Sequence, residues 1–429
     1  MKSTQWPQLV RRVPGLLAAV LVSAALLCAA AILVSSPAHA ADKAKPDDTP
    51  KLSADAGKPL KAAQDALTKE DWAGAAQHLK EAQDLPHKTE YDEFTTNELL
   101  LFLYLHTNDY PNAEKTLEAL VASQYLPKED RPVRIRTLAQ INYQLKDYDK
   151  AVQFSKQAID SGDANEDVYT ILAQSYYLKG DYKNAQQALA EHVAASIKAG
   201  QTPPEERLTL LLNSCVKLND NDCIGHTLEL LVTYYPKPTQ WQNLLYTLIQ
   251  TPGQNDQILL QQYRLAFDLD VLKRPEDYIE MANLASMQGS PGEAVRVLQA
   301  GQQKGVFTEA AIKSHSAQML STVKQKQESD LASLPKLAAD ADAAKSGPKY
   351  AGLGLAYYSY QQYDKAVAAL SNALDKGGLR SETETRLLLG ISQIHVGKKD
   401  DAIKTFQLVK GDPKAESLAR LWIIRARQA

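Results

Sequence analysis

A short motif recurs along the chain and limits what the chain can fold into. NYQLKDYDKA, residues 142–151, is echoed by YYLKGDYKNA at residues 176–185 and by YYSYQQYDKA at residues 357–366. The first two copies end on Ala151 and Ala185, which lie 34 residues apart. A fixed period of this length indicates a repeat architecture, in which each unit buries its apolar side against the next unit.

Small residues keep one register around the alanine that ends each copy. Counting back twelve residues from Ala151, Ala185, Ala294, Ala366 and Ala402, the chain has Ala139, Ala173, Ala282, Gly354 and Gly390. Apolar residues recur at intervals of three and four, as in Leu138, Ile141 and Leu145, which predicts amphipathic helices. Because only alanine or glycine lets two helices approach closely, we expect each unit to be a pair of antiparallel helices. A tyrosine beside the turn, such as Tyr148, would fill the wedge between them.

This register resembles the tetratricopeptide repeat family. The family pattern of a large residue, leucine, a small residue and tyrosine, followed by the second-helix alanine, is matched twice: by Tyr169, Leu172, Ala173, Tyr176, Ala185 and Leu189, and by Tyr350, Leu353, Gly354, Tyr357, Ala366, Leu370 and Ala373. The resemblance covers most of the chain after Leu60. It implies an all-α fold, a right-handed superhelical solenoid of antiparallel helix hairpins.

A more local resemblance concerns the middle of the chain. Tyr234-Tyr235-Pro236 followed by Trp241 is similar to exported, periplasmic tetratricopeptide repeat proteins of proteobacteria. Some members of that type are encoded beside TonB-type energy-transducing systems. The resemblance therefore implies a role in supporting an envelope machine.

The first 40 residues differ from the rest. Three basic residues precede an apolar run from Gly15 to Val34, and small residues follow at Ala38 and Ala40. This order predicts a secretory signal peptide over residues 1–40, cut between Ala40 and Ala41, and hence export to the periplasm. The alternative is that residues 15–34 stay uncleaved and anchor the chain in the inner membrane, because the run is long enough to span a bilayer.

Composition and the strength of the repeat signal divide the remaining chain. Residues 41–55 are polar and proline-bearing, which predicts a solvated, disordered tether. We expect an N-terminal repeat block at 56–199, degenerate hairpins at 200–270, one repeat unit at 271–308, an irregular helical linker hairpin at 309–346, and a C-terminal block with a capping helix at 347–429.

The sequence shows no recognisable catalytic or metal-binding arrangement. The closest histidines, His78 and His87, are too far apart to share a helix face as metal ligands, and no glycine-rich phosphate loop follows a strand. The net charge of −3 becomes −6 without the three basic residues of the leader, which disfavours binding to nucleic acid. We therefore expect no enzyme activity, no metal, no small-molecule cofactor and no nucleic-acid partner.

Two cysteines, Cys215 and Cys223, remain after the expected cleavage. They flank a predicted helix turn at similar distances, and an exported chain meets an oxidising compartment, so we expect them to form a disulfide that stabilises a degenerate repeat. The alternative is a reactive thiol pair.

The resemblance also implies a partner-binding groove, lined by the first helix of each hairpin. The positions not needed for packing are Arg136, Gln140, Tyr143, Thr170, Gln174, Tyr177, Leu355, Tyr358, Leu387, Ile391 and Ile394. Tyrosine, glutamine and arginine could hold an extended peptide, and the apolar set at 387–394 suggests docking of a helix or strand. The alternative is that such tyrosines only pack on the next hairpin.

Together these features predict a periplasmic scaffold that binds a protein or peptide. The alternative function is a membrane-anchored structural subunit of an envelope assembly or secretion complex, with residues 15–34 as the anchor.

Overall fold

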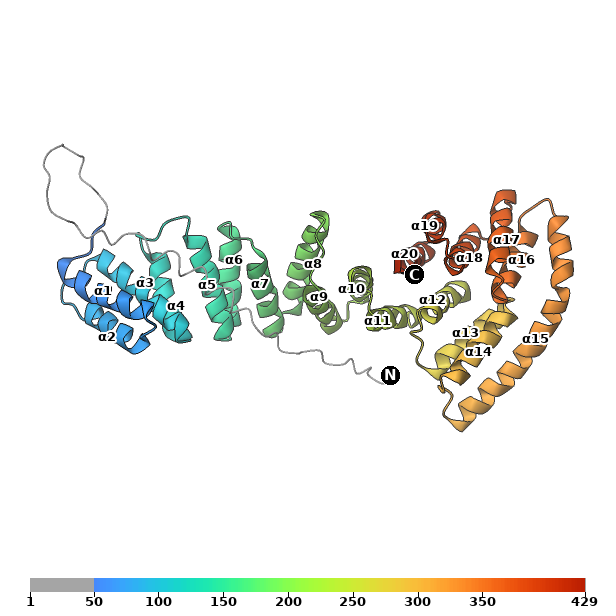
Figure 1. The fold of residues 1–429 in the computed structure, drawn as a ribbon, viewed down its shortest axis with the longest axis horizontal. Helices are drawn as coiled ribbons and strands as arrows, with labels where there is room; N and C mark the ends of the chain where they lie inside the picture. The colour runs from blue at the N-terminus through green and yellow to red at the C-terminus, as the bar shows by residue number, and fades with distance from the viewer. Residues whose placement is uncertain (1–49, 429) are drawn as a thin grey trace. The chain divides into compact units, whose positions relative to one another are not determined.

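The described chain is entirely helical. The computed structural model describes residues 50–428, which contain 20 α-helices and no strand (Figure 1). The predicted signal peptide, its cleavage between Ala40 and Ala41, the alternative anchor at 15–34 and most of the tether lie outside these residues. The first helix begins at Ala54, so the last two residues of the predicted tether are helical. Within residues 50–428, no helix is both long enough and apolar enough to cross a membrane.

The helices divide into two compact units, and the predicted block at 56–199 extends past the division. The N-terminal unit ends at Asp181 and the C-terminal unit begins at Tyr182. The N-terminal unit contains α1 (Ala54–Thr68), α2 (Trp72–Gln83), α3 (Glu90–His106), α4 (Tyr110–Ala122), α5 (Arg131–Gln144), α6 (Tyr148–Asp160) and α7 (Glu166–Leu178). The C-terminal unit contains α8 (Tyr182–Lys198), α9 (Glu205–Leu218), α10 (Asn221–Tyr234), α11 (Pro238–Ile249), α12 (Asp256–Asp268), α13 (Pro275–Met287), α14 (Pro291–Gln303), α15 (Ala310–Asp342), α16 (Pro348–Ser359), α17 (Tyr363–Lys376), α18 (Glu382–His395), α19 (Lys399–Gln407) and α20 (Pro413–Gln428).

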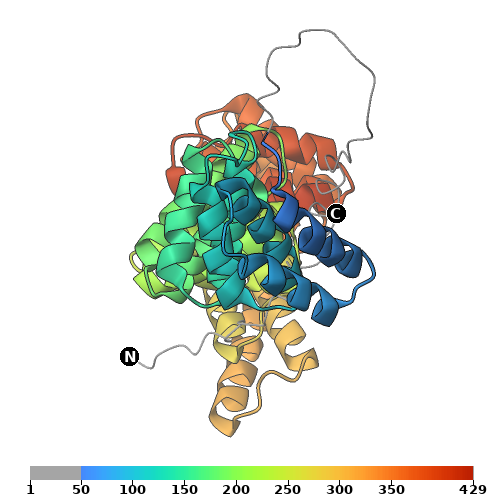
Figure 2. The same cartoon turned by 90° about the vertical axis from the view of Figure 1, so that its left-hand side faces the viewer.

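In the N-terminal unit each helix packs against the next in the chain, and α5 also packs against α7 (Figure 1 and Figure 2). The repeated alanines lie at these crossings: Ala139 and Ala151 are fully buried and belong to one cluster with Ile171 of α7. The α5–α6 hairpin thus buries its apolar side against the helix that follows, as the repeat predicts. The small residues are needed because a larger side chain would separate the helices.

An aspartate before a tyrosine or tryptophan caps the second helix of several hairpins. Asp147 caps α6, because its side chain accepts a hydrogen bond from the backbone N–H of Lys150 at 3.1 Å. Asp71 and Asp109 cap α2 and α4 in the same way. An aspartate at this position satisfies a backbone N–H that the helix itself cannot. These Asp-Tyr and Asp-Trp pairs therefore mark where α2, α4 and α6 begin.

The C-terminal unit corrects one prediction. Residues 309–346 were expected to form a hairpin, whereas α15 is one continuous helix of 33 residues. This segment has no glycine between Ala310 and Asp342 that could end a helix, and it is rich in alanine, lysine and glutamine. Its one proline, Pro335, lies inside the helix without ending it.

The final helix, α20, joins the end of the C-terminal unit to its earlier part. It packs on α19 as a capping helix, and it also contacts α12 and α10. Arg420 pairs with Glu229 of α10 at 3.1 Å, and Arg425 pairs with Asp268 of α12 at 2.7 Å. The helices from α10 to α20 therefore form a closed ring of contacts within this unit.

Candidate functional site

The predicted groove residues of the N-terminal unit form one partly exposed surface, which we call the α5–α7 surface. It consists of Arg136, Gln140 and Tyr143 on α5 and Thr170, Gln174 and Tyr177 on α7. All six side chains are half-buried. Because α5 and α7 are packed neighbours and the two sets lie 34 residues apart, equivalent positions on the two helices follow one another along this surface.

Some polar groups of the α5–α7 surface are already bonded within the chain, and others are not. Arg136 pairs with Asp163 at 3.2 Å, and the hydroxyl of Thr170 donates to the carbonyl oxygen of Glu166 at 2.9 Å. Tyr143 packs edge-on against Tyr148, and burial raises its pKa above the ordinary value. In the described part of the chain, the side-chain amides of Gln140 and Gln174 have no hydrogen-bond partner, so both can still bind another chain.

The predicted groove residues of the C-terminal unit lie elsewhere. Leu387 and Ile391 are 1 % exposed and Ile394 is 8 % exposed, because α18 is enclosed by α16, α17, α19 and α20. Tyr358 is also buried, and only Leu355 is half-buried. The apolar docking surface expected at 387–394 is therefore not open to a partner in this structure.

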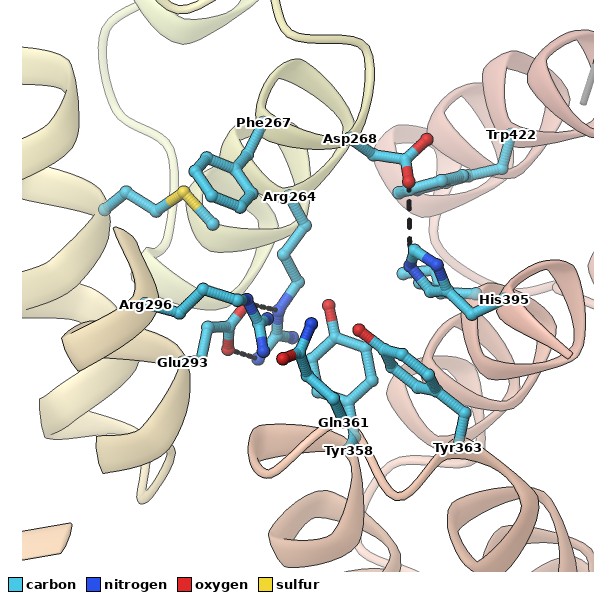
Figure 3. A pocket seen from close by; sticks show the side chains of 12 residues that line it. Arg264, Phe267, Asp268, Glu293, Arg296, Tyr358, Gln361, Tyr363, His395 and Trp422 are labelled. Atoms are coloured by element: carbon cyan, nitrogen blue, oxygen red, sulfur yellow. Dashed lines mark hydrogen bonds and ion pairs between the residues drawn. The ribbon is translucent and has the colours of Figure 1, made fainter. Parts of the chain in front are cut away.

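A polar cavity of about 130 Å³ lies inside the C-terminal unit (Figure 3). Residues of α12, α13, α14, α16, α18 and α20 and of the start of α17 line the cavity. The cavity is therefore formed by the closed ring of contacts described above. Four charged side chains line it, Arg264, Asp268, Glu293 and Arg296, together with the titratable side chains of Tyr358, Tyr363 and His395. Two of its lining residues, Tyr358 and Ile391, were predicted as groove residues, and the others were not predicted as site residues.

A buried ion pair forms one side of this cavity. The guanidinium of Arg264 donates to both carboxylate oxygens of Glu293, at 2.9 and 2.7 Å, and both side chains are at most 2 % exposed. Burial alone would lower the pKa of Arg264 and raise that of Glu293, but each charge stabilises the other. The net result is a raised pKa for Arg264 and a lowered pKa for Glu293, so both remain ionised.

Glycine allows Glu293 to be buried at this place. A Cβ atom on Gly292 would lie 2.7 Å from the carbonyl oxygen of Ser359 and 2.6 Å from the ring of Tyr360. With glycine there, α14 approaches the end of α16 closely, and the backbone N–H of Glu293 donates to the hydroxyl of Ser359 at 3.1 Å. The Gly292-Glu293 pair is the one sequence signal that could have pointed to this contact.

A second charged group lies across the cavity. Asp268 accepts from Arg425 at 2.7 Å and lies 3.6 Å from the ring nitrogen of His395, which in turn stacks on Tyr363 with ring centroids 4.3 Å apart. Burial lowers the pKa of His395, and the positive charges of Arg296 and Arg425 lower it further. The negative charge of Asp268 raises this pKa but does not outweigh the other causes. The lowered pKa favours the neutral form of His395 at pH 7, which can donate or accept a hydrogen bond.

The structure joins Cys215 and Cys223 in a disulfide, with Cα atoms 5.7 Å apart. Cys215 lies in the last turn of α9 and Cys223 in the first turn of α10. Asn219, in the left-handed conformation, ends α9, and Asp220 caps α10 by accepting from the N–H of Cys223 at 3.1 Å. Among the described residues, no group of three or more histidine, cysteine, aspartate or glutamate side chains is placed to hold a metal ion.

The disulfide has a direct test in the full-length protein isolated from cells. We expect a digest made without reductant to contain one peptide pair linked through Cys215 and Cys223, and we expect reduction to separate it. Replacing both cysteines with serine should lower the free energy of unfolding by about 2–3 kcal/mol on the chain-entropy model. Recovery of both residues as free thiols from the untreated protein would contradict the prediction.

Comparisons with known proteins identify the repeats and little else. Residues 137–161 and 352–416 each match a model described as tetratricopeptide repeat. Both stretches contain hairpins described above, α5–α6 and α16–α19, so the chain carries tetratricopeptide repeats there. No curated protein matches the chain.

Solved structures of low identity share the helical architecture. The C-terminal part of a tetratricopeptide repeat-containing protein from Cytophaga hutchinsonii is 11 % identical, with 62 % of this chain and 95 % of that chain covered and a TM-score of 0.34. A tetratricopeptide repeat protein from Parabacteroides merdae is 11 % identical, with 77 % and 99 % covered and a TM-score of 0.30. A structure of Naa15/Naa10 bound to HypK is 14 % identical, with 86 % and 66 % covered and a TM-score of 0.36.

Proposed function

We propose that this chain is a non-enzymatic scaffold that binds a protein or peptide partner along the α5–α7 surface. Two observations favour this surface. It carries polar and aromatic side chains that remain partly exposed at equivalent positions of neighbouring helices, whereas the corresponding positions of the C-terminal unit are mostly buried. Tetratricopeptide repeats commonly serve as protein-binding scaffolds, and residues 137–161, which match that repeat, include most of α5.

The amides of Gln140 and Gln174 are the observation that carries the proposal. Each amide offers one acceptor and two donors, which is the complement of a peptide backbone. Because α5 and α7 are packed neighbours, amides on both helices can bond the backbone of one extended peptide while Tyr143 and Tyr177 contact its side chains. Such contacts are tolerant of sequence, as a scaffold requires.

We place this scaffold in the periplasm, where it would support an envelope machine such as a TonB-type system. The basis is the leader at residues 1–40 and the local resemblance around Trp241, both of which are features of the sequence. Cell fractionation separates this proposal from the anchored alternative. A mature chain that begins at Ala41 and is released by osmotic shock supports the periplasmic scaffold, and a full-length chain retained with the inner membrane supports a subunit anchored by residues 15–34.

Photo-cross-linking in intact cells tests the binding surface. A photoreactive residue placed at Gln140 or Gln174 should capture the same partner band, because both positions face the same bound segment. Replacing both glutamines with alanine should lower the recovery of that partner by about tenfold or more, since two backbone hydrogen bonds are lost at about 1 kcal/mol each. Mass spectrometry of the captured band identifies the partner.

The matched control lies on the second helix of the same hairpin. Gln157 of α6 is exposed, so a photoreactive residue there should not capture the band seen from Gln140. Circular dichroism must show that the alanine variant melts as the parent does. Equal capture from all three positions, or full recovery of the partner by the folded double variant, would overturn the assignment to the α5–α7 surface.

A further inference from the structure

One cation at the cavity of the C-terminal unit, Arg296, forms no ion pair within residues 50–428, although the Glu293 carboxylate acts on it at longer range. Arg264 is paired with Glu293, and Arg425 is paired with Asp268. Glu384 adds a more distant negative charge that acts on Arg264. Arg296 differs: within residues 50–428 no carboxylate forms an ion pair with it, and its one hydrogen bond, to the carbonyl oxygen of Ser359, is 3.4 Å long. The guanidinium of Arg296 thus keeps most of its donors available at the cavity wall.

Uncharged donors converge on the same space. Figure 3 shows the hydroxyl ends of Tyr358 and Tyr363 pointing into the cavity, between the Arg264–Glu293 pair and His395. No hydrogen bond joins either hydroxyl to another group in the described part of the chain. Burial and the nearby Glu293 carboxylate raise the pKa of Tyr358 well above its ordinary value, so this hydroxyl keeps its proton and can donate.

The size and the apolar part of the wall limit what could fill the cavity. Phe267, Ile391 and Trp422 line it beside the polar groups. Its volume of about 130 Å³ is close to that of an engineered cavity of about 150 Å³ that accepts a benzene molecule. The space therefore suits a ligand of about six non-hydrogen atoms, with one polar end and one apolar end.

We propose that this cavity binds a small organic monocarboxylate. Its carboxylate would lie against Arg296 and accept from the hydroxyls of Tyr358 and Tyr363, while its hydrocarbon part would contact Phe267 and Trp422. A planar carboxylate matches the two parallel donors of a guanidinium, and one negative charge matches the single unpaired cation. Inorganic phosphate fits less well, because its second charge would remain unpaired in a confined space. This site is separate from the α5–α7 surface and does not depend on the proposed scaffold role.

Butyrate and butyramide test the charge requirement on the full chain. The two molecules have the same number of non-hydrogen atoms and nearly the same shape, but only butyrate is charged. Saturation-transfer NMR and calorimetric titration at pH 7 should show butyrate binding at least about tenfold more tightly than butyramide, because hydrogen bonds to a charged group are the stronger ones. Phosphate should bind more weakly than butyrate.

Two variants assign the binding to this cavity. Arg296→Gln should weaken butyrate at least about tenfold and change butyramide far less, since it removes the charge and leaves a shorter, neutral polar side chain. The matched control, Arg380→Gln, removes the same charge from an exposed position on the loop between α17 and α18 and should bind butyrate as the parent does. Tyr363→Phe removes one donor and should weaken butyrate by a smaller factor, which provides a second reading if Arg296→Gln does not fold.

Three results would overturn the proposal. The first is equal binding of butyrate and butyramide to the parent protein. The second is unchanged butyrate binding by folded Arg296→Gln, or by Tyr363→Phe where Arg296→Gln does not fold. The third is no butyrate signal at about 20 mM, a concentration at which even a weak complex of this size should be populated.

Discussion

Replacing Glu293 with glutamine is expected to lower the free energy of unfolding of the C-terminal unit by about 3–5 kcal/mol. Glutamine has nearly the same shape as glutamate, so packing changes little. The variant leaves the charged guanidinium of Arg264, which is 2 % exposed in the parent, without its counterion in a largely buried site. Amide hydrogen exchange measured by mass spectrometry should show faster exchange in α12 and α14, because these two helices carry the pair.

The double variant Arg264→Met with Glu293→Leu is the decisive comparison. It removes both charges together, so it should recover most of the lost stability, since apolar replacement of a buried ion pair is often neutral. Glu229→Gln is the matched control: it breaks the pair with exposed Arg420 and should cost about 1 kcal/mol or less. Equal decreases in the free energy of unfolding for Glu293→Gln and Glu229→Gln would show that the buried pair contributes no more to stability than the exposed pair.

The same pair predicts how acid acts on this unit. The folded state lowers the pKa of Glu293 below its ordinary value of 4.5. The stability contributed by this carboxylate is therefore complete above about pH 4.5 and is lost as the pH falls through the lower folded-state pKa. Glu293→Gln cannot titrate there, so the difference in stability between parent and variant should shrink in acid.

Much of the architecture follows from residues that are visible in the sequence. The recurring alanines predict helix crossings, and Ala139 and Ala151 are fully buried at such a crossing. The all-helical fold class is confirmed, and the capping helix expected at the C-terminal end is α20. These features depend on contacts between neighbours in the chain, so a local pattern is enough to predict them.

The cavity depends on contacts that a local pattern cannot reveal. Glu293 occupies the position just before the repeat alanine, where other copies have Lys365 and Asp401, both exposed. By that pattern Glu293 should also face water. It is buried because α14 packs on α16, beyond the long helix α15, and because Arg264 reaches it from α12. The charge of a residue does not indicate which distant helix will cover it.

The expected groove of the C-terminal unit shows the same limit. The positions of Leu387 and Ile391 follow from the register, and their apolar character suggests a docking site. The segment that packs against α18 at the end of the unit is part of the same chain, since α20 contacts α18 as well as α12 and α10. The apolar pattern predicts a docking surface for a partner, whereas this chain's own helices cover these residues.

Replacing Trp422 with alanine should have an effect comparable to that of breaking the ion pair. Trp422 is fully buried on α20, and its ring is stacked on Phe406 of α19 with centroids 6.1 Å apart. Removing a buried tryptophan costs about 3–5 kcal/mol, from lost apolar transfer and the cavity that remains. In the described structure its indole N–H has no hydrogen-bond partner, so the loss is one of packing. Hydrogen exchange should become faster in α19 and α20.

Which helices of the variant exchange amide hydrogens faster shows whether α20 stabilises the whole ring of contacts. If it does, Trp422→Ala will also speed exchange in α10 and α12, which meet α20 through Glu229 and Asp268. Leu408→Ala is the control, because Leu408 is 59 % exposed beside the same helices and should change stability by about 0.5 kcal/mol or less. Faster exchange confined to α19 and α20 would mean that α20 is only a terminal cap, and that the contacts with α10 and α12 add little to the stability of the unit.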